Sequence, residues 1–136
     1  MNNICILGTG KQGTAAAYDL LLYAKPKKII LLDSVESSLK ECLAKIKPVK
    51  SSKTEIILKK INLNNKDELV NILKDYDIML SAVPYPFNPM LTKIAIESST
   101  SMVDLGGHTN NVIKQLSFSE IAKDKNISIV PDCGMG

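Results

Sequence analysis

Three glycines stand within six residues close to the start of the chain, in the stretch ILGTGKQG. Gly8, Gly10 and Gly13 match the pattern G-x-G-x-x-G, which here directly follows the apolar run NICIL and opens a segment of helix-forming residues. In that setting the first glycine permits a tight turn, the second lets a pyrophosphate approach the backbone, and the third lets the helix pack on the strand. The helix N-terminus would offer free amide groups to phosphate oxygens. The turn, with Lys11 and Gln12 inside it, is therefore a candidate pyrophosphate site.

An acidic residue stands where a dinucleotide site would need one. Asp33 lies 20 residues after Gly13, at the end of the apolar run IILL, where a carboxylate can bind an adenosine ribose. Its oxygens could accept hydrogen bonds from both ribose hydroxyls, whereas the 2′-phosphate of NADP would meet a like charge. Asp33 thus predicts NAD in preference to NADP, although Lys11 and nearby lysines leave NADP open. The structural alternative is that the glycines only form a tight turn and Asp33 only caps the next helix.

The remaining glycines follow the ends of later apolar runs. Gly106 and Gly107 come after TSMVDL, and Gly134 and Gly136 come after ISIVPDC, so every glycine lies beyond the carboxyl end of a predicted strand. Ligands bind at that edge of an open parallel sheet. We therefore count Gly106 among the candidate cofactor-binding residues.

The segment SAVPYPFN is predicted to face the adenine and ribose of a dinucleotide. Ser81, Ala82 and Val83 end a strand that Pro84 terminates, because proline has no amide hydrogen for the ladder. All four are candidate cofactor-binding residues. For the tyrosine and phenylalanine that follow, two roles stay open: contact with a bound ring, or cover for the edge of the sheet.

Two titratable residues at the same edge could move a proton. His108, the single histidine, follows DLGG, and Asp132 ends the last predicted strand. They are the candidate catalytic residues, because imidazole and carboxylate groups commonly act as general acids and bases. The alternative for His108 is a structural or solvated side chain. Three cysteines without a C-x-x-C pair predict neither a metal site nor a disulfide framework.

Apolar runs typical of strands alternate with helical periodicity along the whole chain. We expect strands at 3–8, 27–33, 54–63, 77–84, 100–106 and 127–132, and helices at 11–24, 34–46, 65–76, 88–99 and 110–125, the last one broken near 117–119. Asn88 is expected to cap its helix, with Pro89 in the first helical position. Such alternation predicts an α/β protein with a doubly wound, six-stranded parallel sheet, a Rossmann fold, in a single domain over residues 1–136.

Composition narrows the partners that we expect. Lys and Arg exceed Asp and Glu by 17 − 14 = 3 charges, the lysines are scattered, and tryptophan is absent, so no nucleic-acid surface is predicted. No apolar run reaches the ~18 residues of a membrane span, and the N-terminus lacks the pattern of a signal peptide. We expect a cytoplasmic protein in a reducing compartment.

Two stretches resemble a known family. SAVPYPFNPMLTKIAIESSTSMVDLGGHTNNVIKQL and AKDKNISIVPDCGMG are similar to the saccharopine dehydrogenase-like group, and within it most similar to the lysine 6-dehydrogenase branch. The resemblance runs over essentially the whole chain. Its specific parts are FN with the helix after the fourth strand, DLGGH after the fifth and PDCG after the sixth.

The resemblance implies an N-terminal NAD(P)-binding domain of an amino-acid dehydrogenase that acts on lysine or a related amine. It also implies a longer C-terminal domain for the substrate and for homodimer contacts, so we expect this chain alone to bind cofactor without turnover. Two alternatives remain. One is an NADP-dependent dehydrogenase of saccharopine or a carboxylated polyamine; the other is a regulatory nucleotide-sensing domain without catalysis.

Overall fold

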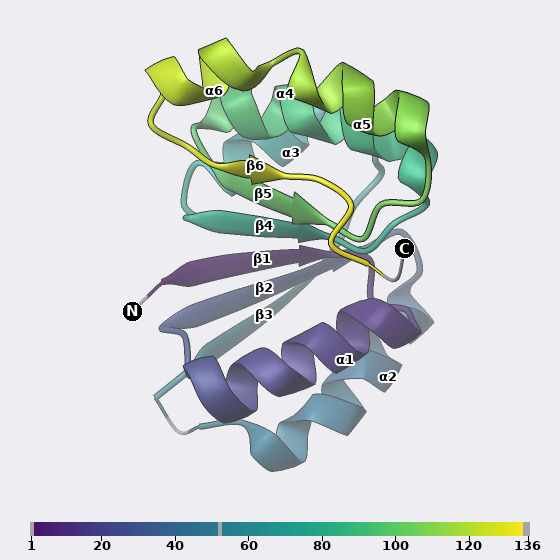
Figure 1. Ribbon diagram of the computed structural model, residues 1–136. Helices are drawn as coiled ribbons and strands as arrows, with labels where there is room; N and C mark the ends of the chain where they lie inside the picture. The colour runs from purple at the N-terminus through teal and green to yellow at the C-terminus, as the bar shows by residue number, and fades with distance from the viewer. Residues whose placement is uncertain (1, 52, 135–136) are drawn as a thin grey trace.

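Six strands, all parallel, form one sheet in the order β3-β2-β1-β4-β5-β6 (Figure 1). The computed structural model describes residues 2–51 and 53–134; Gly136 lies outside the described residues. The strands are β1 (Asn3–Leu7), β2 (Lys28–Asp33), β3 (Glu55–Lys60), β4 (Ile78–Ser81), β5 (Ser101–Asp104) and β6 (Ile129–Val130). The helices are α1 (Lys11–Asp19), α2 (Glu36–Ile46), α3 (Lys66–Leu73), α4 (Asn88–Ser98), α5 (Thr109–Leu116) and α6 (Ser119–Asp124). The predicted doubly wound α/β fold is confirmed.

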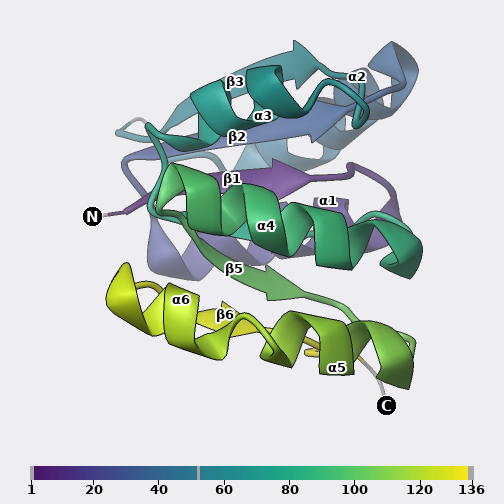
Figure 2. The same cartoon turned by 90° about the horizontal axis from the view of Figure 1, so that it is seen from above.

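Helices cover both faces of the sheet. Helices α1 and α2 lie on one face, and α3 and α4 on the other, with α5 beside α4 and α6 continuing from α5 (Figures 1 and 2). The predicted break in the last helix is confirmed at Ser117 and Phe118. At the break, the Ser117 and Ser119 hydroxyls donate to the carbonyl oxygens of Lys114 and Leu116, which competes with continued helix.

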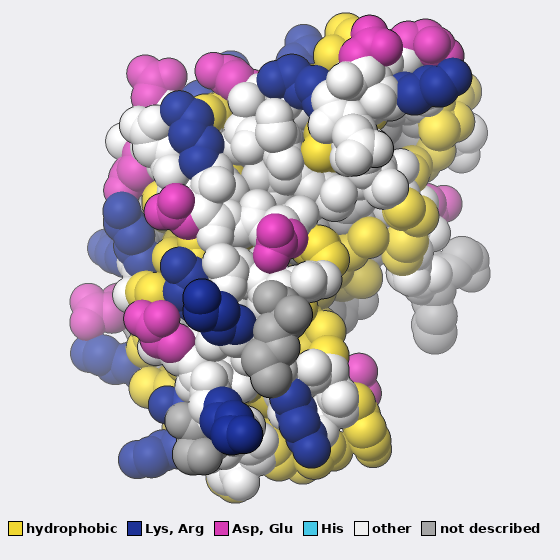
Figure 3. Space-filling view, turned by 90° about the vertical axis from the view of Figure 1, so that its left-hand side faces the viewer, with side chains coloured by type: hydrophobic (Ala, Val, Ile, Leu, Met, Phe, Trp, Pro, Cys, Tyr) yellow, Lys and Arg dark blue, Asp and Glu magenta, His cyan; other side chains and the backbone are white. Residues whose placement is uncertain are grey.

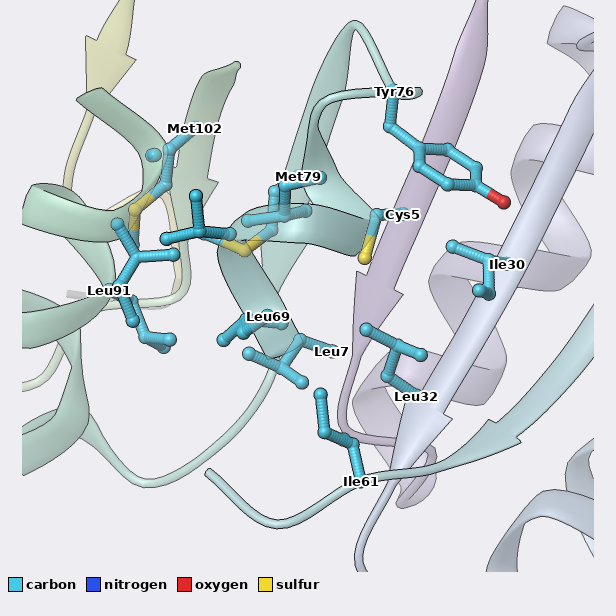
Figure 4. Packing of buried hydrophobic residues seen from close by; sticks show 14 residues of the cluster. Cys5, Leu7, Ile30, Leu32, Ile61, Leu69, Tyr76, Met79, Leu91 and Met102 are labelled. Atoms are coloured by element: carbon cyan, nitrogen blue, oxygen red, sulfur yellow. The ribbon is translucent and has the colours of Figure 1, made fainter. Parts of the chain in front are cut away.

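The central strand β1 sends alternate side chains into two separate cores, since successive residues of a strand point to opposite faces. Ile4 and Ile6 pack with residues of α1 and α2, while Cys5 and Leu7 pack with residues of α3 and α4. Figure 4 shows the second core, where Leu69 of α3 lies next to Leu7 and Leu91 of α4 lies next to Met102 of β5. A strand buried on both faces has to be apolar, and this is why its four buried residues, Ile4 to Leu7, form an unbroken apolar run.

Several boundaries differ from the sequence prediction. The helix expected over 11–24 is an α-helix only to Asp19 and continues as a π-helical turn over Leu20–Ala24, and the strand expected over 77–84 ends at Ser81. Strand β3 ends at Lys60 rather than 63, because Asn62 starts a turn in which its Oδ1 and carbonyl accept the N–H groups of Asn64 and Asn65. Strand β6 has only two residues. Asn88 is not a cap: a 3₁₀ turn over Tyr85–Phe87 starts the helix earlier, and Asn88 Oδ1 accepts a hydrogen bond from the buried Ser81 hydroxyl at 2.8 Å.

The edge at which the strands begin carries intermixed charges. Figure 3 looks onto this side of the molecule, where lysines and acidic residues are scattered among one another. Asp77, just before β4, accepts the backbone N–H of Asn3, and the Lys28 ammonium lies 4.9 Å from the centre of the Tyr76 ring. Across the described residues, no helix combines the length and apolarity that crossing a membrane requires.

We predict that Ile6→Ala lowers the free energy of unfolding by about 2–5 kcal/mol, the usual cost of truncating a fully buried isoleucine. Ile113→Ala is the matched control, because that isoleucine is 60% exposed, and it should change stability by less than about 0.5 kcal/mol. Urea titrations with an unchanged slope measure both values. Equal effects of the two substitutions would contradict the placement of β1 at the centre of the sheet.

Candidate functional site

The turn between β1 and α1 is built from backbone atoms in close contact. Gly8 has a φ of +95°, and its N–H donates to the Leu32 carbonyl at 2.8 Å, which ties the turn to the end of β2. A Cβ on Gly8 would lie 2.7 Å from the Ala82 carbonyl oxygen, and one on Gly13 would overlap the Gly8 carbonyl oxygen. Side chains at these two positions would therefore displace the turn from the sheet.

Gly10 differs from the other two glycines because the space in front of it is open. A Cβ built there meets no atom within 4 Å. The Gly10 backbone is extended, and its carbonyl accepts the N–H of Thr14 as the first bond of α1. The free amide groups at the start of α1 therefore stand beside unfilled space, as an anion-binding helix N-terminus requires.

Asp33, at the end of β2, is bonded directly to this turn. Its Oδ2 accepts the backbone N–H of Thr9 at 2.7 Å and the Thr9 hydroxyl at 2.8 Å, and its Oδ1 accepts the N–H of Val35 at 2.9 Å. Partial burial alone would raise the pKa of Asp33, but the hydrogen bonds from Thr9 and Val35 outweigh it and hold the pKa below 3.8. The carboxylate is therefore ionised throughout the neutral range.

A cleft of about 420 Å³ opens between the glycine turn and the loops that follow β3 and β4. Its walls are Leu7, Gly8, Gly10, Asp33, Ser34, Ile61, Asn62, Leu63, Asn64, Ala82, Val83, Pro84 and Phe87. It thus gathers six of the predicted cofactor-binding residues. Sequence reasoning missed the wall after β3, which it treated as strand, although the cluster of asparagines in NLNN is a turn signal. Phe87 lines the cleft, which leaves the ring-contact role available to it.

Five other predicted residues lie outside the walls of this cleft. Ser81 is 1% exposed and donates its hydroxyl to Asn88. It therefore joins the end of β4 to the start of α4 and does not face the cleft. Gly13 packs under the turn. Lys11 and Gln12 are exposed on the first turn of α1, and Gly106 lies on the turn after β5, where a Cβ would overlap the Asp132 carboxylate.

His108 and Asp132 lie on two adjoining turns after β5 and β6. The Gly107 N–H donates to Asp132 Oδ1 at 3.2 Å, which joins the turns, and both candidate side chains are exposed. The His108 ring stacks on Tyr85, with ring centroids 5.4 Å apart and planes within 7° of parallel. Tyr85 also lies against Gly107. The aromatic residue after β4 thus covers the sheet edge and holds the imidazole.

A fully buried carboxylate, Asp104, organises these turns. Its Oδ1 accepts the N–H groups of Gly106 at 2.8 Å and Asp132 at 3.1 Å, and its Oδ2 accepts Gln115 Nε2 at 2.7 Å. The same Gln115 nitrogen donates to the hydroxyl of Thr92 in α4. Buried charges persist only where such bonds compensate their lost hydration. Sequence reasoning missed Gln115, because a lone amide in a helix gives no signal of a partner on a distant strand.

The comparison with known families decides the classification. The family model described as the saccharopine dehydrogenase NADP-binding domain matches residues 4–130. The chain belongs to this family. It is accordingly an NAD(P)-binding domain of the saccharopine dehydrogenase type, and the cleft at the glycine turn lies at the carboxyl edge of the sheet, where such folds bind dinucleotides.

Solved structures share the fold of this saccharopine dehydrogenase-type domain at low identity. Apo saccharopine dehydrogenase (L-Glu forming) from Saccharomyces cerevisiae matches with a TM-score of 0.75 and 20% identity over 98% of this chain and 27% of that chain. Mycobacterium tuberculosis shikimate dehydrogenase matches at 0.69 and 10%, over 97% and 46%. GenD2 from gentamicin A biosynthesis, in complex with NAD, matches at 0.60 and 11%, over 96% and 34%. The chain spans between about a quarter and a half of these proteins.

Two glycine substitutions should affect different properties of this domain, one its stability and the other its affinity for the cofactor. We predict that Gly13→Ala lowers stability by about 1–3 kcal/mol, because its methyl group would collide with the Gly8 carbonyl. Gly10→Ala should leave stability within about 0.5 kcal/mol and weaken dinucleotide binding about tenfold or more, since its methyl group projects into free space before the helix N-terminus. Thermal unfolding and calorimetric titration with NAD measure the two effects. Unchanged NAD affinity in Gly10→Ala would contradict a pyrophosphate at this turn.

Proposed function

We propose that this domain binds NAD in the cleft at the glycine turn and serves a dehydrogenase that oxidises the amine-bearing carbon of lysine or a related amino acid. One observation carries the cofactor part of the proposal. Gly10, with open space in front of it, and the ionised Asp33 line the same cleft. In a dinucleotide site the pyrophosphate lies at the first position and the adenosine ribose at the second.

The residues that line the cleft suit the pyrophosphate and the adenosine half of a dinucleotide. The amide groups at the start of α1 would bind the pyrophosphate, and a carboxylate oxygen of Asp33 would accept a hydrogen bond from the adenosine ribose. The adenine ring would lie among the apolar side chains of Leu63, Val83 and Phe87. When bound, the nicotinamide supplies the hydride acceptor.

The substrate half of the proposal rests on the turns after β5 and β6. Oxidation of an amine-bearing carbon requires its ammonium to lose a proton before a hydride leaves, and an imine that forms in this way is hydrolysed by water. His108 and Asp132 are the proposed proton acceptors, because both are exposed on turns that Asp104 fixes at the carboxyl edge of the sheet. His108 would accept the proton on a ring nitrogen and Asp132 on Oδ2, since its Oδ1 is bonded to Gly107.

Further parts of the proposal concern the whole protein. The chain spans 27% of the yeast enzyme, so we propose that substrate contacts and a homodimer interface come from additional sequence, and that this chain alone binds cofactor without turnover. Cys5, Cys42 and Cys133 are all free, in support of a cytoplasmic location.

A second candidate is an NADP-dependent dehydrogenase of saccharopine or a carboxylated polyamine. The family to which the chain belongs is described as NADP-binding, and the similar yeast structure is a saccharopine dehydrogenase. A hollow of about 360 Å³ lies beside the cleft and is lined by Ser34, Lys60, Ile61, Asn62 and Glu68. It favours this candidate, because Lys60 could pair with a 2′-phosphate there, while the charge of Glu68 is offset by its ion pair with Lys59.

We predict that the chain binds NAD about tenfold or more tightly than NADP, the discrimination that ~1.4 kcal/mol supplies. Asp33→Asn should remove most of this preference, because it removes the charge that repels a 2′-phosphate. Glu36→Gln is the matched control: it removes an equal charge in the first turn of α2, from a side chain paired with Lys40 rather than with the glycine turn. Calorimetric titrations with both cofactors measure the ratios. Tighter binding of NADP by the unmodified chain would favour the second candidate instead.

A further inference from the structure

We infer that Thr9 is a positioning residue that sets the preference of the cleft between NAD and NADP, and that it acts through the Asp33 carboxylate. The inference rests on the proposed function, because it concerns how the same cleft tells two dinucleotides apart. Thr9 occupies the first variable position of the glycine pattern, to which the fingerprint assigns no role of its own.

Both donors of Thr9 converge on one carboxylate oxygen. Its N–H and its hydroxyl reach Asp33 Oδ2 at 2.7 and 2.8 Å, and the threonine is only 3% exposed. Hydrogen bonds to an ionised carboxylate are stronger than those between neutral groups. Since Oδ1 is held as well, by the N–H of Val35, the carboxylate is fixed at both oxygens and cannot rotate freely.

Counting acceptor positions shows what remains for a ligand. An ionised carboxylate offers about four lone-pair positions, and three hydrogen bonds from this chain already use Asp33. Oδ2 is filled by Thr9, so the remaining position is on Oδ1. The site as built therefore favours a single hydroxyl donor. A 2′-phosphate has no proton to give and would face a fixed negative charge.

Removing the Thr9 hydroxyl should change the ratio of the affinities for NAD and NADP. Without the Thr9 hydroxyl, the carboxylate keeps the Thr9 N–H on Oδ2 and the Val35 N–H on Oδ1, but it loses the second bond that orients Oδ2 and is held less firmly against the turn. The hollow with Lys60 adjoins the cleft through Ser34, Ile61 and Asn62, which line both. A 2′-phosphate could then approach the lysine with less repulsion, while NAD would lose a pre-positioned acceptor.

Thr14 provides a matched control on the same turn. It is also a buried threonine, and its hydroxyl donates to the Thr9 carbonyl at 3.0 Å, so it stabilises the turn without touching Asp33. A substitution that merely loosens the turn should weaken both cofactors equally. A substitution that acts through Asp33 should change the ratio of their affinities.

The experiment titrates NAD and NADP into the 136-residue chain and its variants by calorimetry, with thermal unfolding as the check on folding. Thr9→Val should lower the preference for NAD roughly tenfold, which corresponds to about 1.4 kcal/mol. Thr9→Ser should keep the original ratio, because it restores the donor, and Thr14→Val should keep it even where both affinities fall. If Thr9→Val does not fold, Thr9→Cys should move the ratio the same way by less, since a thiol is a weak donor.

A double-mutant cycle tests whether Thr9 acts through Asp33. In the Asp33→Asn background, Thr9→Val should move the ratio no further, because the charge that it positions is gone. An unchanged ratio in Thr9→Val, or an equal shift in Thr14→Val, overturns the inference while leaving the proposed function in place. A chain that binds neither cofactor overturns the proposed function and the inference together.

Discussion

Contact between backbone and backbone at the first turn determines where the ligand edge of this molecule lies. The Gly8 carbonyl occupies the space that a side chain on Gly13 would take, and Gly8 itself lies against the Ala82 carbonyl at the end of β4. Three segments can approach this closely only where no Cβ intervenes. The start of α1 is thereby held over the boundary between β1 and β4, the point at which the strand order reverses direction. The cleft is a consequence of that placement.

Two carboxylates at the same edge of the sheet each accept three hydrogen bonds from the chain, but they differ in how far they are exposed. Asp104 is fully buried, and its oxygens are bonded to two turns and to the Gln115 amide, so it serves the framework. Asp33 is bonded to the chain as well, but it remains partly exposed on the wall of the cleft. The first carboxylate fixes the turns that carry His108 and Asp132. The second combines a framework role with a surface that a ligand can contact.

The fold was predictable from sequence because its strands, helices and first turn each leave a local signal. Strands buried on both faces read as apolar runs, and the glycine pattern followed by an acid marks the first turn. The features that escaped prediction depend on partners far away in the chain. Asn88 looks like a cap beside Pro89, yet its side chain bonds to Ser81, and Gln115 acquires its role only once α5 lies against Asp104. The asparagine turn after β3 was missed because the apolar Ile61 and Leu63 prolonged the strand pattern.

The place of β1 in the sheet has a consequence during synthesis. This strand pairs with β2 on one side and with β4 on the other, but β4 begins only at Ile78. At the usual ribosomal rate of about 5–20 residues per second, the second edge of β1 stays open for seconds after β2 has been made. It exposes apolar residues and unpaired amide and carbonyl groups, the features that promote aggregation. Addition of β4 closes this edge, so β1 is paired on both sides only after residue 81 has been made.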